Sequence, residues 1–112
     1  MDALNSFCVV MTTTDQEAHA ESLAAGIVAA RLGACVQVQA IRSFYEWQGR
    51  PEVAREWLLM VKTRQALYGE LERFIRQNHP YDTPEVLCLP VTAGAADYLA
   101  WVREQTTPLR QA

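Results

Sequence analysis

Residues 57–61, Trp-Leu-Leu-Met-Val, form an unbroken apolar run. Successive side chains of a β-strand point to opposite faces of its sheet, so a strand with this run presents apolar side chains on both faces. We therefore predict a central strand over residues 53–63 that is covered on each side. Gly-Arg-Pro at residues 49–51 is a turn sequence, and it predicts a long hairpin joining this strand to an earlier one over residues 34–49.

The earlier strand of this hairpin changes its hydrophobic phase part-way along. From residue 36 to residue 40, apolar side chains alternate with two glutamines, which predicts one buried and one polar face. Beyond that point the large side chains, Tyr45 and Trp47 among them, fall on the face that held the glutamines. A β-bulge or a sharp bend would cause this change, and we predict one near residues 40–42.

The remaining elements are predicted from hydrophobic spacing and from helix boundary signals. Residues 14–17, Thr-Asp-Gln-Glu, match a capping box for a helix that runs to residue 32 and ends at Gly33. Pro80 is expected to stop a second helix. The other predicted elements are a strand over residues 6–12, the second helix over residues 64–78, a strand over residues 85–91, a helix over residues 95–105 and a loose tail over residues 106–112.

These elements follow the order β-α-β-β-α-β, with a short helix added at the C-terminal end. That order is typical of the ferredoxin-like α+β fold, in which two helices cover one face of a four-stranded antiparallel sheet. The length of 112 residues predicts a single domain over residues 1–112. Because two helices cover only one sheet face, we expect the chain to self-associate. The alternative is that the C-terminal helix alone covers the second face.

Composition argues against several classes of partner. The net charge is −3 and the ten lysines and arginines form no run, so a nucleic-acid partner is not expected. No apolar stretch approaches the roughly 20 residues that span a bilayer, so a membrane partner is not expected either. The first residues lack the features of a signal peptide, which predicts a cytoplasmic location. Cys8, Cys35 and Cys88 are widely spaced and are expected to be buried free thiols; the alternative is that one of them binds a soft metal such as copper.

His79 and Glu85 are the candidate metal ligands. The proline-rich loop between them is expected to bring an imidazole and a carboxylate together, a ligand pair that would suit copper or zinc. The alternative is that His79 caps the second helix and that Glu85 forms a surface or interface pair. His19, on the first helix, is expected to be solvated.

Lys62 is the candidate residue for binding a small anion, because an amine in an otherwise apolar strand is costly unless it meets a negative charge. Four aromatic residues could line a cleft between subunits: Tyr45, Trp47, Tyr81 and Trp101. The alternative is that Lys62 pairs with Glu56 or Glu85 and that the aromatics only pack. The sequence has no Ser-His-Asp order, paired-carboxylate motif, His-Glu-x-x-His or Gly-rich phosphate loop, so an enzyme is not expected.

Six segments of the chain carry a family resemblance. They are Gly-Ala-Cys-Val-Gln at residues 33–37, Ser-Phe-Tyr-Glu-Trp-Gln-Gly at 43–49, Glu-Trp-Leu-Leu-Met-Val-Lys-Thr at 56–63, His-Pro-Tyr-Asp-Thr-Pro-Glu-Val at 79–86, Leu-Pro-Val at 89–91 and Asp-Tyr-Leu-Ala-Trp at 97–101. In this order and spacing they resemble the CutA family of divalent-cation tolerance proteins, over residues 6–103. The resemblance implies a homotrimer of ferredoxin-like subunits whose long hairpins pair between subunits. It also implies a role in the response to metal ions, with copper or another divalent cation as ligand.

The resemblance further implies a metal site that uses a cysteine late in the first strand and a histidine just before the His-Pro pair. Those positions are Thr12 and Asn78 here, so a thiolate and an imidazole are missing from that soft-metal site. Analogy with other proteins of the same fold suggests a second function. The nitrogen-regulatory PII proteins are trimers of the same fold that bind nucleotides and effectors between subunits, and a PII-like sensor would bind its small anionic or nucleotide effector through Lys62.

Overall fold

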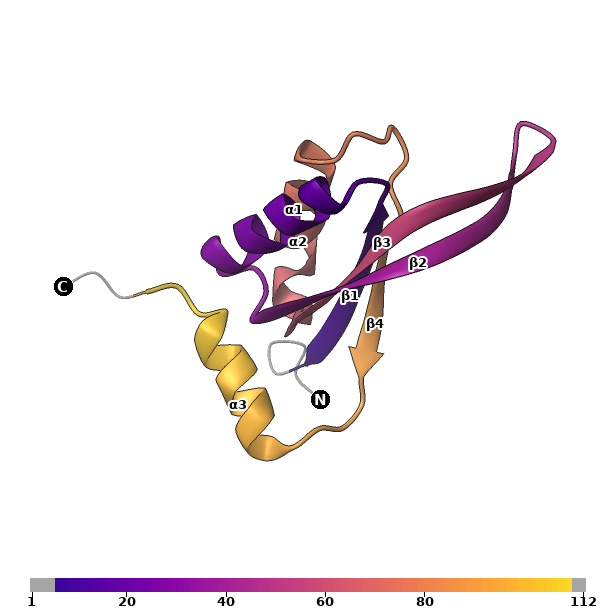
Figure 1. Ribbon diagram of the computed structural model, residues 1–112. Coiled ribbons are helices and arrows are strands. Elements are labelled where there is room, and N and C mark those ends of the chain that lie inside the picture. Colours follow the sequence, from indigo (N-terminus) through magenta and orange to yellow (C-terminus); the bar gives the residue numbers. More distant parts are fainter. Residues whose placement is uncertain (1–5, 110–112) are drawn as a thin grey trace.

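The computed structural model describes residues 6–109, and these residues form one four-stranded antiparallel sheet with three α-helices (Figure 1). The strand order across the sheet is β2-β3-β1-β4. The predicted ferredoxin-like order of elements is confirmed, with the additional C-terminal helix. The elements are β1 Phe7–Thr14, α1 Glu17–Ala29, β2 Cys35–Trp47, β3 Arg50–Arg64, a 3₁₀ turn Gln65–Leu67, α2 Tyr68–Gln77, β4 Val86–Val91 and α3 Ala96–Gln105.

The central position predicted for the apolar strand is confirmed, because β3 lies between β2 and β1. Helices α1 and α2 cover one face of the sheet, which we call the helical face (Figure 1). On that face Leu59 and Val61 are fully buried, together with Val10 of β1, Ile27 of α1 and Ile75 of α2. None of the helices between residues 6 and 109 has the length and apolar content that a membrane-spanning helix requires.

The other face of the sheet, which we call the open face, is covered only at one end. Helix α3 packs there, where Val102 forms a small apolar cluster with Phe7 and Ala34. Leu87 and Leu89 of β4 remain 53% and 43% exposed. The C-terminal helix therefore does not cover the second face by itself.

The β2–β3 hairpin extends well beyond the rest of the sheet (Figure 1). Strand β1 pairs with β3 only as far as Trp57, and Trp57 in turn pairs with Ala40 of β2. Residues 41–47 and 50–56 therefore form a two-stranded ribbon, and no third strand from the described part of the chain lies beside it. The radius of gyration of 15.1 Å exceeds the roughly 13 Å of an average domain of this length, because the ribbon projects from the body.

The predicted bulge near residues 40–42 is wrong. The β2–β3 register runs without interruption from Cys35↔Lys62 to Trp47↔Arg50. The hydrophobic phase changes because the surroundings change: beyond Ala40 the ribbon has left the helices, so the helical face no longer demands apolar side chains. The turn is Gln48-Gly49, both with positive φ (50° and 77°), as in the two-residue turns that match strand twist, so the predicted turn at residues 49–51 is shifted.

Both predicted boundary signals of the first helix are wrong. Gln16 occupies the N-cap position without a side-chain capping bond, and the hydroxyl of Thr14 pairs with His19 Nδ1 instead, at 2.7 Å. At the other end α1 stops at Ala29, and Arg31 takes the positive φ of 59°. Gly33 has a packing role: a Cβ there would lie 2.5 Å from a Val61 methyl group.

The predicted loose tail is wrong for its first residues. The Arg64 guanidinium donates to the hydroxyl and the carbonyl oxygen of Thr106, both at 2.9 Å. The Arg31 guanidinium donates to the carbonyl oxygens of Glu104 and Thr107, both at 2.7 Å. These bonds hold the end of α3 against the body; residues 110–112 of that predicted tail lie outside the described residues.

Gly33→Ala should lower the free energy of unfolding by about 1–3 kcal/mol, because the new methyl group would overlap the buried Val61 and Ile27 side chains. Gly69→Ala is the matched control. Apart from the helix's own backbone, no atom of the described residues lies within 4 Å of a Cβ added at residue 69, and alanine should raise helix stability by up to about 1 kcal/mol. Urea unfolding at one protein concentration measures both. A Gly33→Ala chain as stable as the wild type would contradict the packing role.

Candidate functional site

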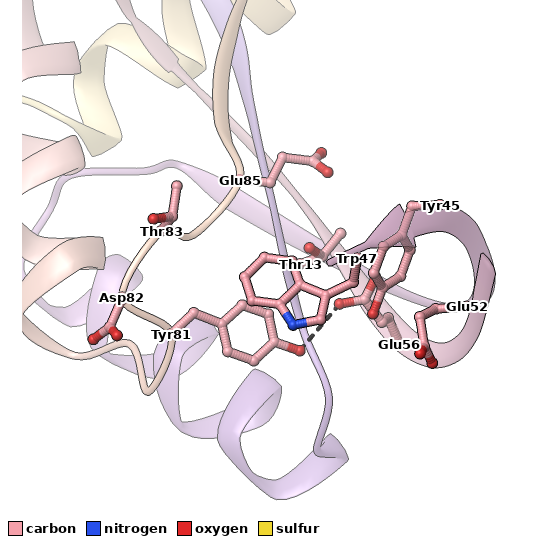
Figure 2. Close-up of a pocket in the computed structure, with 9 residues that line it drawn as sticks. All are labelled: Thr13, Tyr45, Trp47, Glu52, Glu56, Tyr81, Asp82, Thr83 and Glu85. Atoms are coloured by element: carbon pink, nitrogen blue, oxygen red, sulfur yellow. Dashed lines mark hydrogen bonds between the residues drawn. The ribbon is translucent and has the colours of Figure 1, made fainter. Parts of the chain in front are cut away.

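A pocket of about 630 Å³ opens along one side of the ribbon, between the ribbon and the loop that follows α2 (Figure 2). Its wall on the sheet side comes from β1, β2 and β3, and its other wall comes from residues 81–85. The lining residues are Thr13, Tyr45, Trp47, Glu52, Glu56, Tyr81, Asp82, Thr83 and Glu85.

Strand register explains why the sheet residues meet in this pocket. Tyr45 is the cross-strand partner of Glu52, so these two side chains point to the same face. Trp47 is two residues after Tyr45 on β2, and Glu56 is four residues after Glu52 on β3. Both share that face, because side chains alternate with a period of two. Thr13 joins them from β1 through its pairing with Leu58, two residues after Glu56.

The pocket is acidic. Among the described residues that line it, four are carboxylates and none is a lysine or arginine. Glu56 is only 8% exposed, and its carboxylate accepts a hydrogen bond of 3.1 Å from the Tyr81 hydroxyl, whose ring reaches across from the loop (Figure 2). Burial, and then the negative charge of Glu56, raise the pKa of Glu85 above its ordinary value. The same two causes, with the hydrogen bond to Glu56, raise the pKa of Tyr81.

Two histidines attach the pocket loop to the body. His79 Nε2 donates to the carbonyl oxygen of Thr13 at 2.7 Å, and its Nδ1 accepts from the backbone N–H of Tyr81 at 3.1 Å. The His79 ring makes edge contacts with the rings of His19 and Tyr81, at centroid distances of 5.5 and 4.7 Å. His19 Nε2 donates to the carbonyl oxygen of Asn78. These contacts hold Tyr81 where it can reach Glu56.

The two candidate metal ligands therefore have different surroundings. Glu85 lines the pocket, whereas His79 is not among the lining residues and has both ring nitrogens hydrogen-bonded to the backbone. The alternative role of His79 as a cap of α2 is wrong, because Asn78 occupies the cap position and its amide donates to Phe74 O at 2.8 Å. The expected solvation of His19 is also wrong, since both of its ring nitrogens are hydrogen-bonded. Within residues 6–109, no three His, Cys, Asp or Glu side chains are grouped so that they could hold one metal ion.

The five residues predicted to bind a ligand do not share one cavity. Tyr45, Trp47 and Tyr81 line the acidic pocket. Lys62 lines a second cavity of about 220 Å³ between α3 and the sheet. The fifth, Trp101, contacts the ring of Tyr98 on α3 at a centroid distance of 5.7 Å.

The alternative in which Lys62 pairs with Glu56 or Glu85 is wrong. Its ammonium nitrogen lies 6.0 Å from the centroid of the Tyr98 ring, and no carboxylate of residues 6–109 is within ion-pair distance. The hydroxyl of Tyr81, rather than Lys62, partners Glu56. The amine therefore faces a small apolar cavity without a negative charge from this part of the chain.

Sequence reasoning missed three acidic members of the pocket, Glu52, Glu56 and Asp82. Glu56 carried a usable signal, because it shares a face with Leu58 and Met60 in an otherwise apolar strand, and a carboxylate there needs a partner. Glu52 and Asp82 gave no sequence signal of a role in a pocket, since charged residues are common in two-stranded ribbons and loops.

The two positions that the family resemblance assigned to a metal site lie apart from the pocket. Thr12 points to the helical face, opposite to Thr13, and its buried hydroxyl has no hydrogen-bond partner among the described residues. Asn78 ends α2, where its carbonyl oxygen accepts from His19. The pocket on the open face is thus built from other residues.

The sequence matches relatives over nearly all of its length. It is 43% identical over 102 residues to the chloroplastic protein CutA of Arabidopsis thaliana, and the matched region covers 90% of this chain and 56% of the relative. It is 39% identical over 99 residues to the divalent-cation tolerance protein CutA of Thermus thermophilus, which covers 88% of this chain and 96% of the relative. The chain thus spans little more than half of the plant relative and almost all of the bacterial one.

Solved structures of CutA proteins have the same fold. The CutA1 structure from Oryza sativa superposes with a TM-score of 0.90 at 34% identity, covering 95% of this chain and 98% of that one. The periplasmic divalent cation tolerance protein CutA from Archaeoglobus fulgidus gives 0.88 at 30% identity, covering 90% and 99%. The family model of the CutA1 divalent ion tolerance protein matches residues 8–105. The chain belongs to the CutA1 family of divalent ion tolerance proteins.

Proposed function

We propose that this chain is a non-enzymatic homotrimer that acts in the response to divalent metal ions, and that its acidic pocket binds the cation. The observation that carries the proposal is the gathering of four carboxylates around one pocket that no lysine or arginine of residues 6–109 lines. A bound cation would offset the charge of Glu56 that raises the pKa of Glu85. A cytoplasmic location stays a prediction.

The residues present fit some cations better than others. Carboxylate and hydroxyl oxygens are the ligands that hard divalent cations prefer, with water completing the coordination. A copper centre that includes His79 fits less well, because copper coordination there would break a hydrogen bond that His79 makes to Thr13 or to Tyr81. We therefore place the cation at Glu56 and Glu85, with His79 as the residue that positions the loop.

The open face supports the trimer. Leu87 and Leu89 are exposed on it, and large apolar side chains are exposed on the ribbon, where Phe44 is 70% and Trp47 is 61% exposed. Large apolar side chains left exposed on a sheet face and on a projecting hairpin are the kind of surface that a protein partner covers. Tyr45 and Trp47 line the pocket and also belong to the hairpin that we propose to pair between subunits, so assembly would add partner atoms to a pocket that holds no three-ligand group in the described residues of one chain.

A second candidate function rests on Lys62. As a PII-like sensor, the trimer would bind a small anion in the cavity beneath α3, where this amine lacks a carboxylate partner among the described residues. The cavity of about 220 Å³ is smaller than the roughly 300–1,000 Å³ of ordinary ligand pockets. Its size favours a small anion over a nucleotide.

Leu89→Arg should convert the trimer to monomers, because a charge would be placed within the apolar open face. Native mass spectrometry should find the wild type at three times the chain mass of 12.6 kDa and the variant at one times that mass. Val28→Arg is the matched control, since Val28 is exposed to a similar degree (45%) but lies on α1. A monomeric wild type, or a Leu89→Arg trimer, would overturn the assembly proposal.

Glu56→Gln and Glu85→Gln should each weaken Mn(II) or Zn(II) binding at least tenfold in calorimetric titrations. In the Glu56→Gln variant the amide oxygen would still accept the Tyr81 hydrogen bond, so the loss would report charge and not loop position. Affinity should also fall as the pH falls through the raised pKa of Glu85, because the proton and the cation compete for this carboxylate.

Two controls complete that titration. Glu70→Gln, exposed at the start of α2, should leave the affinity unchanged. Cu(II) is titrated in parallel against His79→Gln. If His79→Gln abolishes binding of every ion while Glu56→Gln and Glu85→Gln do not, the cation site is at the histidine and our assignment is wrong.

Lys62→Met should abolish the binding of a small anion if the second function is correct, because it keeps the apolar stem and removes the charge. Inorganic phosphate and acetate are the probes, and shifts of the amide resonances of residues 62 and 98 are the readout. Arg73→Met, an exposed cation on α2, is the control. Unchanged spectra of the wild type at millimolar anion would remove this candidate.

A further inference from the structure

Two of the three cysteines meet on the helical face of the sheet, opposite to the face that holds the acidic pocket. Cys8 lies in β1 and Cys88 in the neighbouring edge strand β4. The register pairs Cys8 with Pro90 and Val10 with Cys88, so the two cysteines share a face as diagonal cross-strand neighbours. Burial first, and then the neighbouring Cys88 thiol, raise the pKa of Cys8 to about 12.

The environment of the pair is asymmetric. Cys8 is only 1% exposed, whereas Cys88 is exposed on the edge strand, so solvent reaches the pair from one side and the prediction that all three thiols are buried is wrong. Thr63 is the partner of Cys8 on β3, and its buried hydroxyl has no hydrogen-bond partner among residues 6–109. Cys35 is the partner of Lys62 and therefore faces the opposite side of the sheet.

The spacing of the two cysteines distinguishes between a disulfide bond and a bridging metal ion. Diagonal cross-strand residues have Cα atoms about 7–8 Å apart, and an unstrained disulfide needs less than about 7 Å. Two metal–sulfur bonds of about 2.3 Å each separate their sulfur atoms by up to about 4.6 Å, against about 2 Å for the S–S bond of a disulfide, so a bridging ion suits the wider spacing of diagonal neighbours. The geometry therefore favours a bridging metal ion over a disulfide.

We propose that Cys8 and Cys88 form a two-coordinate site for a soft monovalent cation of the Cu(I) class. Thiolates are the ligands that such ions prefer, and two thiolates suffice for an ion that accepts a low coordination number. Each thiol loses its proton to solvent, two metal–sulfur bonds form, and no electron is transferred. This site lies on the other face of the sheet from the acidic pocket and does not depend on the function proposed there.

The test is an anaerobic competition titration with Cu(I) and a chromogenic Cu(I) chelator, on the full chain in its native assembly. The wild type should take one Cu(I) per chain from the chelator. Cys88→Ser should weaken that binding at least 100-fold, and Cys35→Ser, the matched control on the opposite face, should leave it unchanged. Wild-type affinity in Cys88→Ser, or a loss confined to Cys35→Ser, would overturn the proposal.

A second measurement covers the buried ligand, since Cys8→Ser could disturb the core. Wild-type protein is treated with iodoacetamide with and without one equivalent of Ag(I), a redox-inert ion with the same ligand preference, and peptide masses report the alkylated cysteines. Ag(I) should protect Cys88 and leave the reaction of Cys35 unchanged. Equal alkylation of Cys88 with and without Ag(I) would contradict the site.

Discussion

The difference in length between β3 and its neighbour β1 is the constraint on which the rest of the structure depends. Strand β3 has 15 residues and β1 has 8, so half of β3 can pair only with β2. That half leaves the sheet as a ribbon, and neither a third strand nor a helix of residues 6–109 lies against it. The ribbon then carries Tyr45 and Trp47 past the end of β1, and the acidic pocket forms in the angle between the ribbon and the loop after α2.

Strand alternation then divides the chemistry between the two faces. The helical face holds the apolar core and the Cys8–Cys88 pair, whereas the open face holds the acidic pocket at one end and the Lys62 cavity at the other. Because each of these groups lies on strands, a shift of one residue in register would exchange the faces of all of them. The loop after α2 is attached to the end of β1 by the hydrogen bond between His79 and Thr13. It is attached to α1 by the hydrogen bond between His19 and Asn78.

Much of the fold could be predicted from the chain. The apolar run at residues 57–61 correctly placed β3 inside the sheet, and the order of elements followed from local spacing. The errors share a cause. The capping box failed because Thr14 continues β1 and turns its hydroxyl to His19, and the bulge failed because the ribbon had left the helices. Neither His19 nor the end of β1 is visible to a pattern read over a few neighbouring residues.

The sequence by itself determined the elements, the central strand, the family and several members of the pocket, because periodicity and turn chemistry act over a few residues. Only the tertiary structure decided which of those residues meet. It brought Glu56 to Tyr81, separated Lys62 from Tyr45, occupied both nitrogens of His79 and placed Cys8 beside Cys88. The physical reason is that these contacts depend on strand register and on how far each strand runs, and both are set by pairings between segments that are distant in the sequence.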